Sequence, residues 1–395
     1  MSDPLADPLV ARMRPFGSTI FGRISGLAAQ AGAVNLGQGF PDTEGPDEVR
    51  EAAAHAVLHG DNQYPPPNGT PLLREAIARH RAEHFGVEVD AAAGVLVTHG
   101  ATEAIASCLL ALCEPGDEVV TFEPYYDSYA AIIALAGAKR RTSVLRFPEY
   151  RVEEASLREA FGPRTRAILL NSPHNPTGKV FTTEELELVR DLAVEHDAWI
   201  ITDEVYEHLV FAGATHTPLA TLPGAAERTL SVGSAGKTFS VTGWKLGWVT
   251  GPPAGVAAAA AVKQFLSYAG GAPFQPAVAV GLDLPADYFT HIARELQAKR
   301  DLLVGALRLL DLPVAEPQGT FFVTADLAGL GIEDAASFCF EMPTRFGLAA
   351  IPVSVFHDDP QAAPSIVRFA FCKRDETLFE GITRLDAMVR ELRAG

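Results

Sequence analysis

The chain has little of what disulfide frameworks, metal sites and membrane spans require. Only four cysteines occur among 395 residues. They lie in mostly apolar surroundings without CxxC spacing, which indicates neither a disulfide framework nor a metal site. We therefore expect buried free thiols and no metal. The longest apolar stretches, at 130–138 and 255–262, are well short of the roughly 20 residues that span a bilayer, so no membrane partner is expected.

Positive charge is also scarce. The chain has 32 Lys and Arg against 49 Asp and Glu, a net charge of -17. Because binding to a phosphate backbone requires a basic surface, this balance argues against nucleic acid and favours a small-molecule partner. The N-terminus, MSDPLADPLV, lacks the basic and apolar segments of a secretory signal, which predicts a cytoplasmic protein. No internal repeat is present.

Short β-rich runs are abundant between about residues 95 and 252. Turn residues follow each run, and often a helical pattern, which is typical of an open, mainly parallel sheet covered by helices. Ligands bind such sheets at the carboxyl ends of the strands. The six runs are VLVTHG, EVVTFEP, AILLNSPHNP, AWIITDEVY, TLSVGSAGK and LGWVTGP.

The remainder of the chain predicts a smaller α+β domain. Helical apolar spacing follows residue 290, then come shorter elements, and a final helix begins at Asp375. Residues 1–45 contain the glycine-rich stretch AVNLGQGFPD, which could cross the domain boundary and line the cleft, with Gly39 close to a substrate.

Lys237 is the most informative residue. It lies in SVGSAGKTFSVTGWKLGW, after Ser234 and eight residues before Lys245. A lysine that attacks a carbonyl must be neutral, and a neighbouring cation such as Lys245 lowers its pKa. Ser234 and Lys245 could also bind a phosphate. This arrangement suits pyridoxal phosphate, although an exposed loop with two lysines would give the same pattern.

A second phosphate-binding feature is Gly100-Ala101-Thr102. It follows a strand and opens a helical run, so backbone N–H groups and a hydroxyl meet at a helix N-terminus. The alternative is a plain helix capped by Thr102.

Other polar side chains at strand ends fit the same cofactor. A buried Asp203 needs a cation, which the ring nitrogen of pyridoxal phosphate supplies. Tyr206 and Asn175 could hydrogen-bond the ring oxygen, and Tyr126 could stack on the ring. Arg368, flanked by apolar residues, suits a substrate carboxylate. Each also has a structural alternative: a capping Asp203, core tyrosines, an Asn-Pro turn at Asn175, or Arg368 on the solvent face of an edge strand.

Eight segments in order resemble the class I, fold-type I pyridoxal-phosphate-dependent aminotransferases, over nearly the whole chain. They are NLGQGFPD, NQYPPPNG, GATEAI, EPYYDSY, SPHNPTG, TDEVYEHL, SAGKTFSVTGWKLGW and VRFAFCK. The chain is most similar to the subgroup of kynurenine, glutamine and methionine aminotransferases and actinobacterial N-succinyldiaminopimelate aminotransferases. AERT, KQFLSYAGGAPFQPAVA and FCKRDETL favour the last of these.

The resemblance implies that Lys237 binds the cofactor covalently, Asp203 holds its ring nitrogen, and Asn175 and Tyr206 contact its ring oxygen. Arg368 and Asn175 would bind the substrate carboxylate. Tyr64 would reach the phosphate of the neighbouring subunit, in a homodimer with shared active sites. At Gly270-Gly271-Ala272 the chain departs from relatives that place a polar side chain there, which leaves the contribution across the dimer open.

The expected architecture is α/β. A large cofactor-binding domain, 46–287, would contain a mainly parallel sheet of the seven-stranded type sandwiched by helices, and residues 1–45 and 288–395 would form the small domain. Ile20 and Phe21 are expected near the substrate, with Phe356 and Tyr64 on another wall.

The expected reaction moves an amino group from an L-amino acid to a 2-oxo acid, 2-oxoglutarate, by a ping-pong mechanism. The best donor would be N-succinyl-LL-2,6-diaminopimelate, in lysine biosynthesis. One alternative is a broad kynurenine, methionine and glutamine aminotransferase with cysteine-conjugate β-lyase activity. A remote one is a non-catalytic sensor that binds pyridoxal phosphate.

Overall fold

The computed structural model describes residues 9–17 and 19–394. Residues 1–8 of the predicted small domain, with most of the segment used to predict the compartment, lie outside this part. Residue 18, which shortly precedes the predicted substrate contacts Ile20 and Phe21, does too. Among the described residues, no helix is both long and apolar enough to cross a bilayer.

A seven-stranded sheet forms the centre of the larger body. Its order is β2-β8-β7-β6-β5-β3-β4. Only β8 is antiparallel to its neighbours, so the predicted mainly parallel sheet is confirmed. The strands are β2 (Val95–Thr98), β3 (Glu118–Glu123), β4 (Lys139–Val144), β5 (Thr165–Asn171), β6 (Trp199–Asp203), β7 (Thr229–Ser234) and β8 (Gly247–Thr250).

Helices cover both faces of this sheet. Ile168 and Ile200 pack in one cluster with α6 and α7, whereas Leu169 and Ile201 pack in another with α4, α5 and α9. This division follows from the period of two in a strand, where successive side chains point to opposite faces. The helices of the larger body are α2 (Asp47–His59), α3 (Pro71–Phe85), α4 (Gly100–Leu112), α5 (Asp127–Leu135), α6 (Glu154–Ala160), α7 (Thr183–Glu195), α8 (Ala235–Thr238), α9 (Pro253–Leu266) and α10 (Phe274–Leu282).

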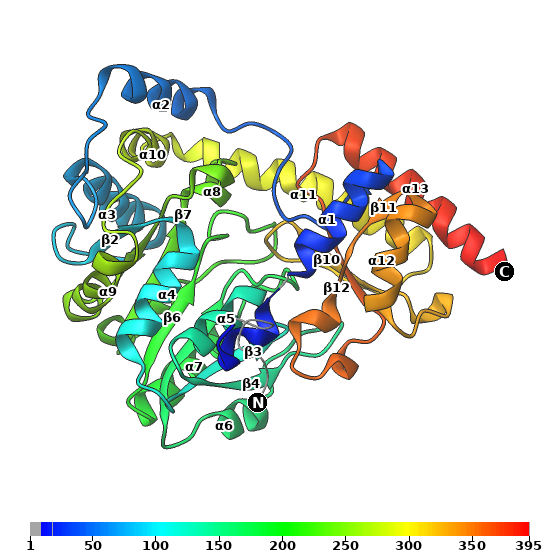
Figure 1. Ribbon diagram of the computed structural model, residues 1–395, viewed down its shortest axis with the longest axis horizontal. Helices are drawn as coiled ribbons and strands as arrows, with labels where there is room; N and C mark the ends of the chain where they lie inside the picture. The colour runs from blue at the N-terminus through cyan, green and yellow to red at the C-terminus, as the bar shows by residue number, and fades with distance from the viewer. Residues whose placement is uncertain (1–8, 18, 395) are drawn as a thin grey trace.

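A smaller body contains the C-terminal part of the chain (Figure 1). Its antiparallel sheet has the order β12-β13-β10-β9. The elements are α11 (Ala286–Leu309), β9 (Val314–Ala315), β10 (Phe322–Asp326), α12 (Ala335–Phe346), β11 (Leu348–Ala349), β12 (Ile351–Pro352), β13 (Ile366–Ala370) and α13 (Asp375–Ala394). The final helix begins at Asp375, as predicted.

The N-terminal segment joins this smaller body. Helix α1 (Ile20–Ala31) packs against α12, and β1 (Val34–Asn35) pairs in parallel with β11. On this ground we propose the division expected from the sequence, with both chain ends in one domain. Short 3-10 helices connect the elements: η1 (Ala11–Phe16), η2 (Leu219–Thr221), η3 (Ala226–Arg228), η4 (Thr242–Trp244), η5 (Ala328–Leu330), η6 (Val353–Phe356) and η7 (Pro360–Ala362).

Candidate active site

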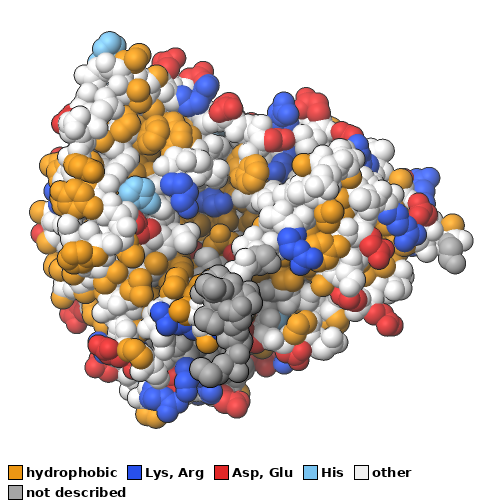
Figure 2. Space-filling model, in the orientation of Figure 1, with side chains coloured by type: hydrophobic (Ala, Val, Ile, Leu, Met, Phe, Trp, Pro, Cys, Tyr) orange, Lys and Arg blue, Asp and Glu red, His pale blue; other side chains and the backbone are white. Residues whose placement is uncertain are grey.

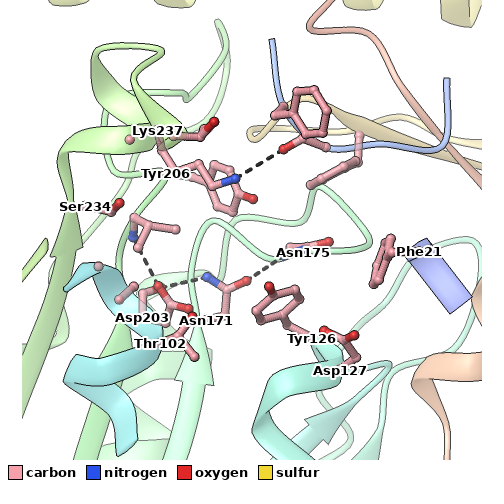
Figure 3. A pocket seen from close by; sticks show the side chains of 18 of the residues that line it. Phe21, Thr102, Tyr126, Asp127, Asn171, Asn175, Asp203, Tyr206, Ser234 and Lys237 are labelled. Atoms are coloured by element: carbon pink, nitrogen blue, oxygen red, sulfur yellow. Dashed lines mark hydrogen bonds between the residues drawn. The ribbon is translucent and has the colours of Figure 1, made fainter. Parts of the chain in front are cut away.

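A cavity of about 430 Å³ lies where the larger body, the N-terminal segment and the smaller body meet. Figure 3 shows side chains of the larger body around it, with Phe21 from the N-terminal segment, and Figure 2 shows the hollow between the bodies. Thirteen residues predicted from the sequence line the cavity: Phe21, Gly39, Gly100, Ala101, Thr102, Tyr126, Asn175, Asp203, Tyr206, Ser234, Lys237, Lys245 and Arg368. The carboxyl ends of the parallel strands thus meet residues of the N-terminal segment and of β13 that are far apart in the sequence.

Lys237 lies in α8, directly after β7, and its Nζ donates to the Gly39 carbonyl oxygen at 3.2 Å. Burial lowers the pKa of Lys237 to about 8, and the charges of Arg368 and Lys245 act in the same direction. A lysine with this pKa is neutral far more often than an exposed one, so it is a better nucleophile.

Asp203 is the last residue of β6 and is buried. Its Oδ2 accepts a hydrogen bond from the Tyr129 hydroxyl at 2.5 Å, and burial raises the pKa of the carboxyl to about 6. Within the described chain, Asp203 has no ion-pair partner. A buried carboxylate at the cavity wall with no ion pair of its own fits the protonated ring nitrogen of pyridoxal phosphate.

The first turn of α4 has the geometry of a phosphate seat. Its N-cap is His99, whose side chain makes no capping hydrogen bond, so first-turn N–H groups can bind an anion. The alternative of a helix capped by Thr102 is therefore wrong. Gly100 has φ +76°, and a Cβ there would lie 3.3 Å from Lys245 Nζ. The glycine thus allows this ammonium to approach the helix end, where Ser234 also lines the cavity.

Arg368 lies in β13, and its side chain is 1% exposed, so the alternative of a solvent-facing arginine is wrong. Nη1 donates to Asn175 Oδ1 at 2.8 Å and Nη2 to the Gly37 carbonyl oxygen at 3.0 Å. Nε is buried without a partner in the described chain. The guanidinium lies 4.0 Å from the centroid of the Phe322 ring. Burial lowers the pKa of Arg368 to about 10, so it stays cationic at neutral pH. A buried cation held only by neutral acceptors fits a substrate carboxylate.

Three predicted contacts lie elsewhere. Phe356 is fully buried with its ring 5.8 Å from that of Phe21, so it forms the layer behind the cavity and not its wall. Ile20 packs against the core of the smaller body. Tyr64 is 79% exposed beside Tyr268 and does not line this chain's cavity.

The sequence analysis missed two residues that hold the site. Tyr129 supports Asp203, as described above. Asn171, at the end of β5, donates to the Asp203 carbonyl oxygen at 2.7 Å and accepts from the Asn175 backbone N–H at 2.6 Å. Sequence spacing could have indicated both residues. Tyr129 lies about one helical turn after the predicted Tyr126, and Asn171 lies four residues before the predicted Asn175.

We expect Tyr129→Phe to shift the acid limb of kcat/KM to higher pH by roughly one unit. The hydroxyl donates to the ionised carboxylate and lowers its pKa; without it, the pKa of Asp203 rises and the carboxylate is protonated at higher pH. The measurement is a pH profile of kcat/KM. Tyr150→Phe is the matched control, because Tyr150 is a buried tyrosine that hydrogen-bonds Thr324 outside the cavity. An unshifted acid limb in Tyr129→Phe would contradict the assignment.

The cavity has a lysine with a lowered pKa, a buried carboxylate, a helix N-terminus and a buried arginine, which are the groups that pyridoxal phosphate and an amino acid require. Comparison with known proteins leads to the same class of enzyme. The profile of the family "Aminotransferase class I and II" matches residues 31–385. The chain belongs to this family and is a pyridoxal-phosphate-dependent aminotransferase of fold type I.

Among its relatives is the probable N-succinyldiaminopimelate aminotransferase DapC of Mycobacterium tuberculosis, which is 49% identical over 96% of this chain and 98% of its own. The methionine aminotransferase of Escherichia coli is 37% identical over 96% and 98% of the two chains. The solved structure of N-succinyldiaminopimelate aminotransferase from Mycobacterium tuberculosis superimposes with a TM-score of 0.94, covering 96% of this chain and 100% of that one.

Proposed function

We propose that this aminotransferase uses N-succinyl-LL-2,6-diaminopimelate as donor and 2-oxoglutarate as acceptor, as a cytoplasmic enzyme of lysine biosynthesis. The choice of donor is supported by the 49% identity, over almost the full length of both chains, to a relative named for this substrate. The buried Arg368 supports any donor with a free α-carboxylate.

We further propose how the side chains act. When bound, pyridoxal phosphate supplies an electron-withdrawing ring that stabilises the charge left at the substrate's α-carbon. Asp203 would keep the ring nitrogen protonated, and Tyr206 and Asn175 would hold the ring oxygen. Lys237 would bind the cofactor covalently in the resting enzyme, and its free Nζ would accept the α-proton and return it as general acid. Ser234, Lys245 and the first turn of α4 would hold the phosphate.

The donor is tested by single-turnover absorbance. The purified holoenzyme is mixed separately with N-succinyl-LL-diaminopimelate, kynurenine, methionine, glutamine and glutamate, and the loss of the yellow form is followed. We expect the succinylated donor to react at least about tenfold faster than the others, a difference of about 1.4 kcal/mol in transition-state free energy. Equal or faster reaction with kynurenine or methionine would overturn this choice of donor.

A broad aminotransferase is the second candidate. Phe21, Tyr126 and Phe322 give the cavity aromatic walls, which suit kynurenine and methionine, and methionine aminotransferase is a relative. Pyruvate and ammonia formed from a cysteine conjugate without any oxo-acid acceptor would reveal the accompanying β-lyase activity. No spectral change with any donor would instead favour a sensor.

We also propose a homodimer with shared active sites. Phe265 and Leu58 are 90% and 74% exposed, and Figure 2 shows hydrophobic side chains gathered on the left of the molecule, in the region of α2, α3 and α9. Such a patch is typical of an interface. Tyr64 lies in the same region beside Tyr268 and does not line this chain's cavity, so we assign it to the cavity of the partner subunit. Sedimentation of the holoenzyme at the mass of a monomer would contradict this proposal.

The departure expected at Gly270-Gly271-Ala272 is supported by the packing around these glycines. A Cβ at Gly270 would lie 2.2 Å from the His99 ring, and Gly271 has φ +66°. Glycine at both positions therefore follows from close packing and backbone conformation within this chain.

A further inference from the structure

Four histidines gather outside the active site, between α3 and the loop that follows β6. His80 and His84 lie one turn apart on α3, with ring centroids 4.3 Å from each other. The ring centroids of both lie close to that of His208, at 4.9 and 5.4 Å. Three imidazoles on one tetrahedral ion have centroids about 5 Å apart, given metal–nitrogen distances of about 2 Å. The fourth histidine, His216, lies beyond Phe85.

The tautomer of His80 leaves a lone pair facing His208. His80 Nδ1 lies 3.0 Å from the Leu282 carbonyl oxygen, which can only accept, so Nδ1 carries the hydrogen and Nε2 does not. Nε2 therefore accepts a hydrogen bond from His208 Nε2 at 2.7 Å, and a bound ion would take the place of that proton between the two nitrogens. Two imidazole nitrogens on one zinc ion lie about 3.3 Å apart, so a small side-chain adjustment suffices. A carbonyl on the second ring nitrogen is also the usual orienting contact of a metal-binding histidine.

Glu207 completes the group. One ligand atom each from His80, Glu207 and His208 lies within 4.8 Å of the others. Arg81 ion-pairs with both Glu207 and Glu204. Burial raises the pKa of Glu207 to about 7, so one guanidinium shared by two carboxyls leaves Glu207 free to lose its proton to a bound cation, and its second oxygen can act as a ligand.

We propose that His80, His208 and Glu207 bind a divalent transition-metal ion of the zinc type. Two imidazoles and a carboxylate are ligands that zinc prefers, with a fourth position open to water or His84. His84 and His208 are only partly buried, so an ion can enter from that side. The site joins α3 to the loop after Asp203, which carries Tyr206, and the bound ion stabilises this connection without touching substrate. The cysteine spacing alone gave no reason to expect such a site.

Zinc binding to the chelator-treated holoenzyme tests the proposal. Calorimetric titration with Zn²⁺ should show one ion bound per chain. Thermal unfolding should show a higher melting temperature with Zn²⁺ than without it. His208→Gln should weaken binding at least about tenfold and abolish the thermal shift. An unchanged affinity in His208→Gln would overturn the site. Unchanged cofactor absorbance in this variant checks its fold.

Two histidine variants are matched controls. His55 and His59 form another pair one turn apart, on the surface helix α2, so His59→Gln should leave zinc binding unchanged. His216→Gln should do the same, although His216 lies near Glu204 and Glu207 in a second possible ligand group. Loss of zinc in either variant would place the ion elsewhere. If His208→Gln does not fold, the site is tested by adding Co²⁺ to the wild-type protein. The visible absorption of a four-coordinate Co²⁺ site supports the proposal, and the absence of this absorption overturns it.

Discussion

Lys237→Ala is expected to abolish transamination, with kcat reduced at least about 10⁴-fold, while the protein still binds pyridoxal phosphate noncovalently. Alanine removes both the covalent attachment and the group that moves the α-proton. The noncovalent contacts at Asp203, Ser234 and the first turn of α4 remain. The Nζ atom donates to a single carbonyl, that of Gly39, and the ring nitrogen of the bound cofactor would still face Asp203, so the fold should persist.

Three measurements separate catalysis from binding in this variant. They are kcat with the best donor, cofactor retention by absorbance after dialysis, and exchange of the donor's α-proton for deuterium. We expect retained cofactor with no exchange. Lys139→Ala is the control, because Lys139 is exposed on the edge strand β4 and its loss should change none of the three. Full activity in Lys237→Ala would refute the role of Lys237.

Sequence reasoning located the parallel strands because each is a short apolar run followed by turn residues. It failed at β4, whose sequence KRRTSV begins with three cations and is only partly buried. As an edge strand, β4 pairs on one side only, with β3. Charged residues are favoured at such edges because they prevent pairing with other chains, and they hide the strand from a search for apolar runs.

Residues that line the cavity were predictable where the proposed chemistry demands a particular residue type at a strand end, as for Lys237 and Asp203. Tyr129 was not predictable in this way, because its role depends on a contact with Asp203 that exists only after folding. The expectation for Phe356 was wrong for a related reason. An apolar aromatic suits a cavity wall and the layer behind it equally well, and only packing decides between them.

Replacement of Arg368 has the second large expected effect. Truncating a buried, hydrogen-bonded charge that pairs with a ligand costs about 3 kcal/mol, so Arg368→Ala should lower kcat/KM for amino-acid donors about 10²-fold, mainly through KM. Arg368→Lys should rescue only part of this loss, because an ammonium cannot bind a carboxylate bidentately. Steady-state kinetics with several donors measure both effects.

A merely structural role of Arg368 would give a different result. Arg300 is the matched control, since it is also buried, lies 4.9 Å from the centroid of the Phe211 ring and donates to the Pro317 carbonyl oxygen away from the cavity. Arg300→Ala should lose packing and stability but keep KM. The 2-oxo acid acceptor carries the same carboxylate, so Arg368→Ala should weaken both half-reactions, whereas a primary amine without a carboxylate should react at an unchanged rate. Equal losses for that amine and for amino acids would show that Arg368 supports the fold and does not bind the substrate carboxylate.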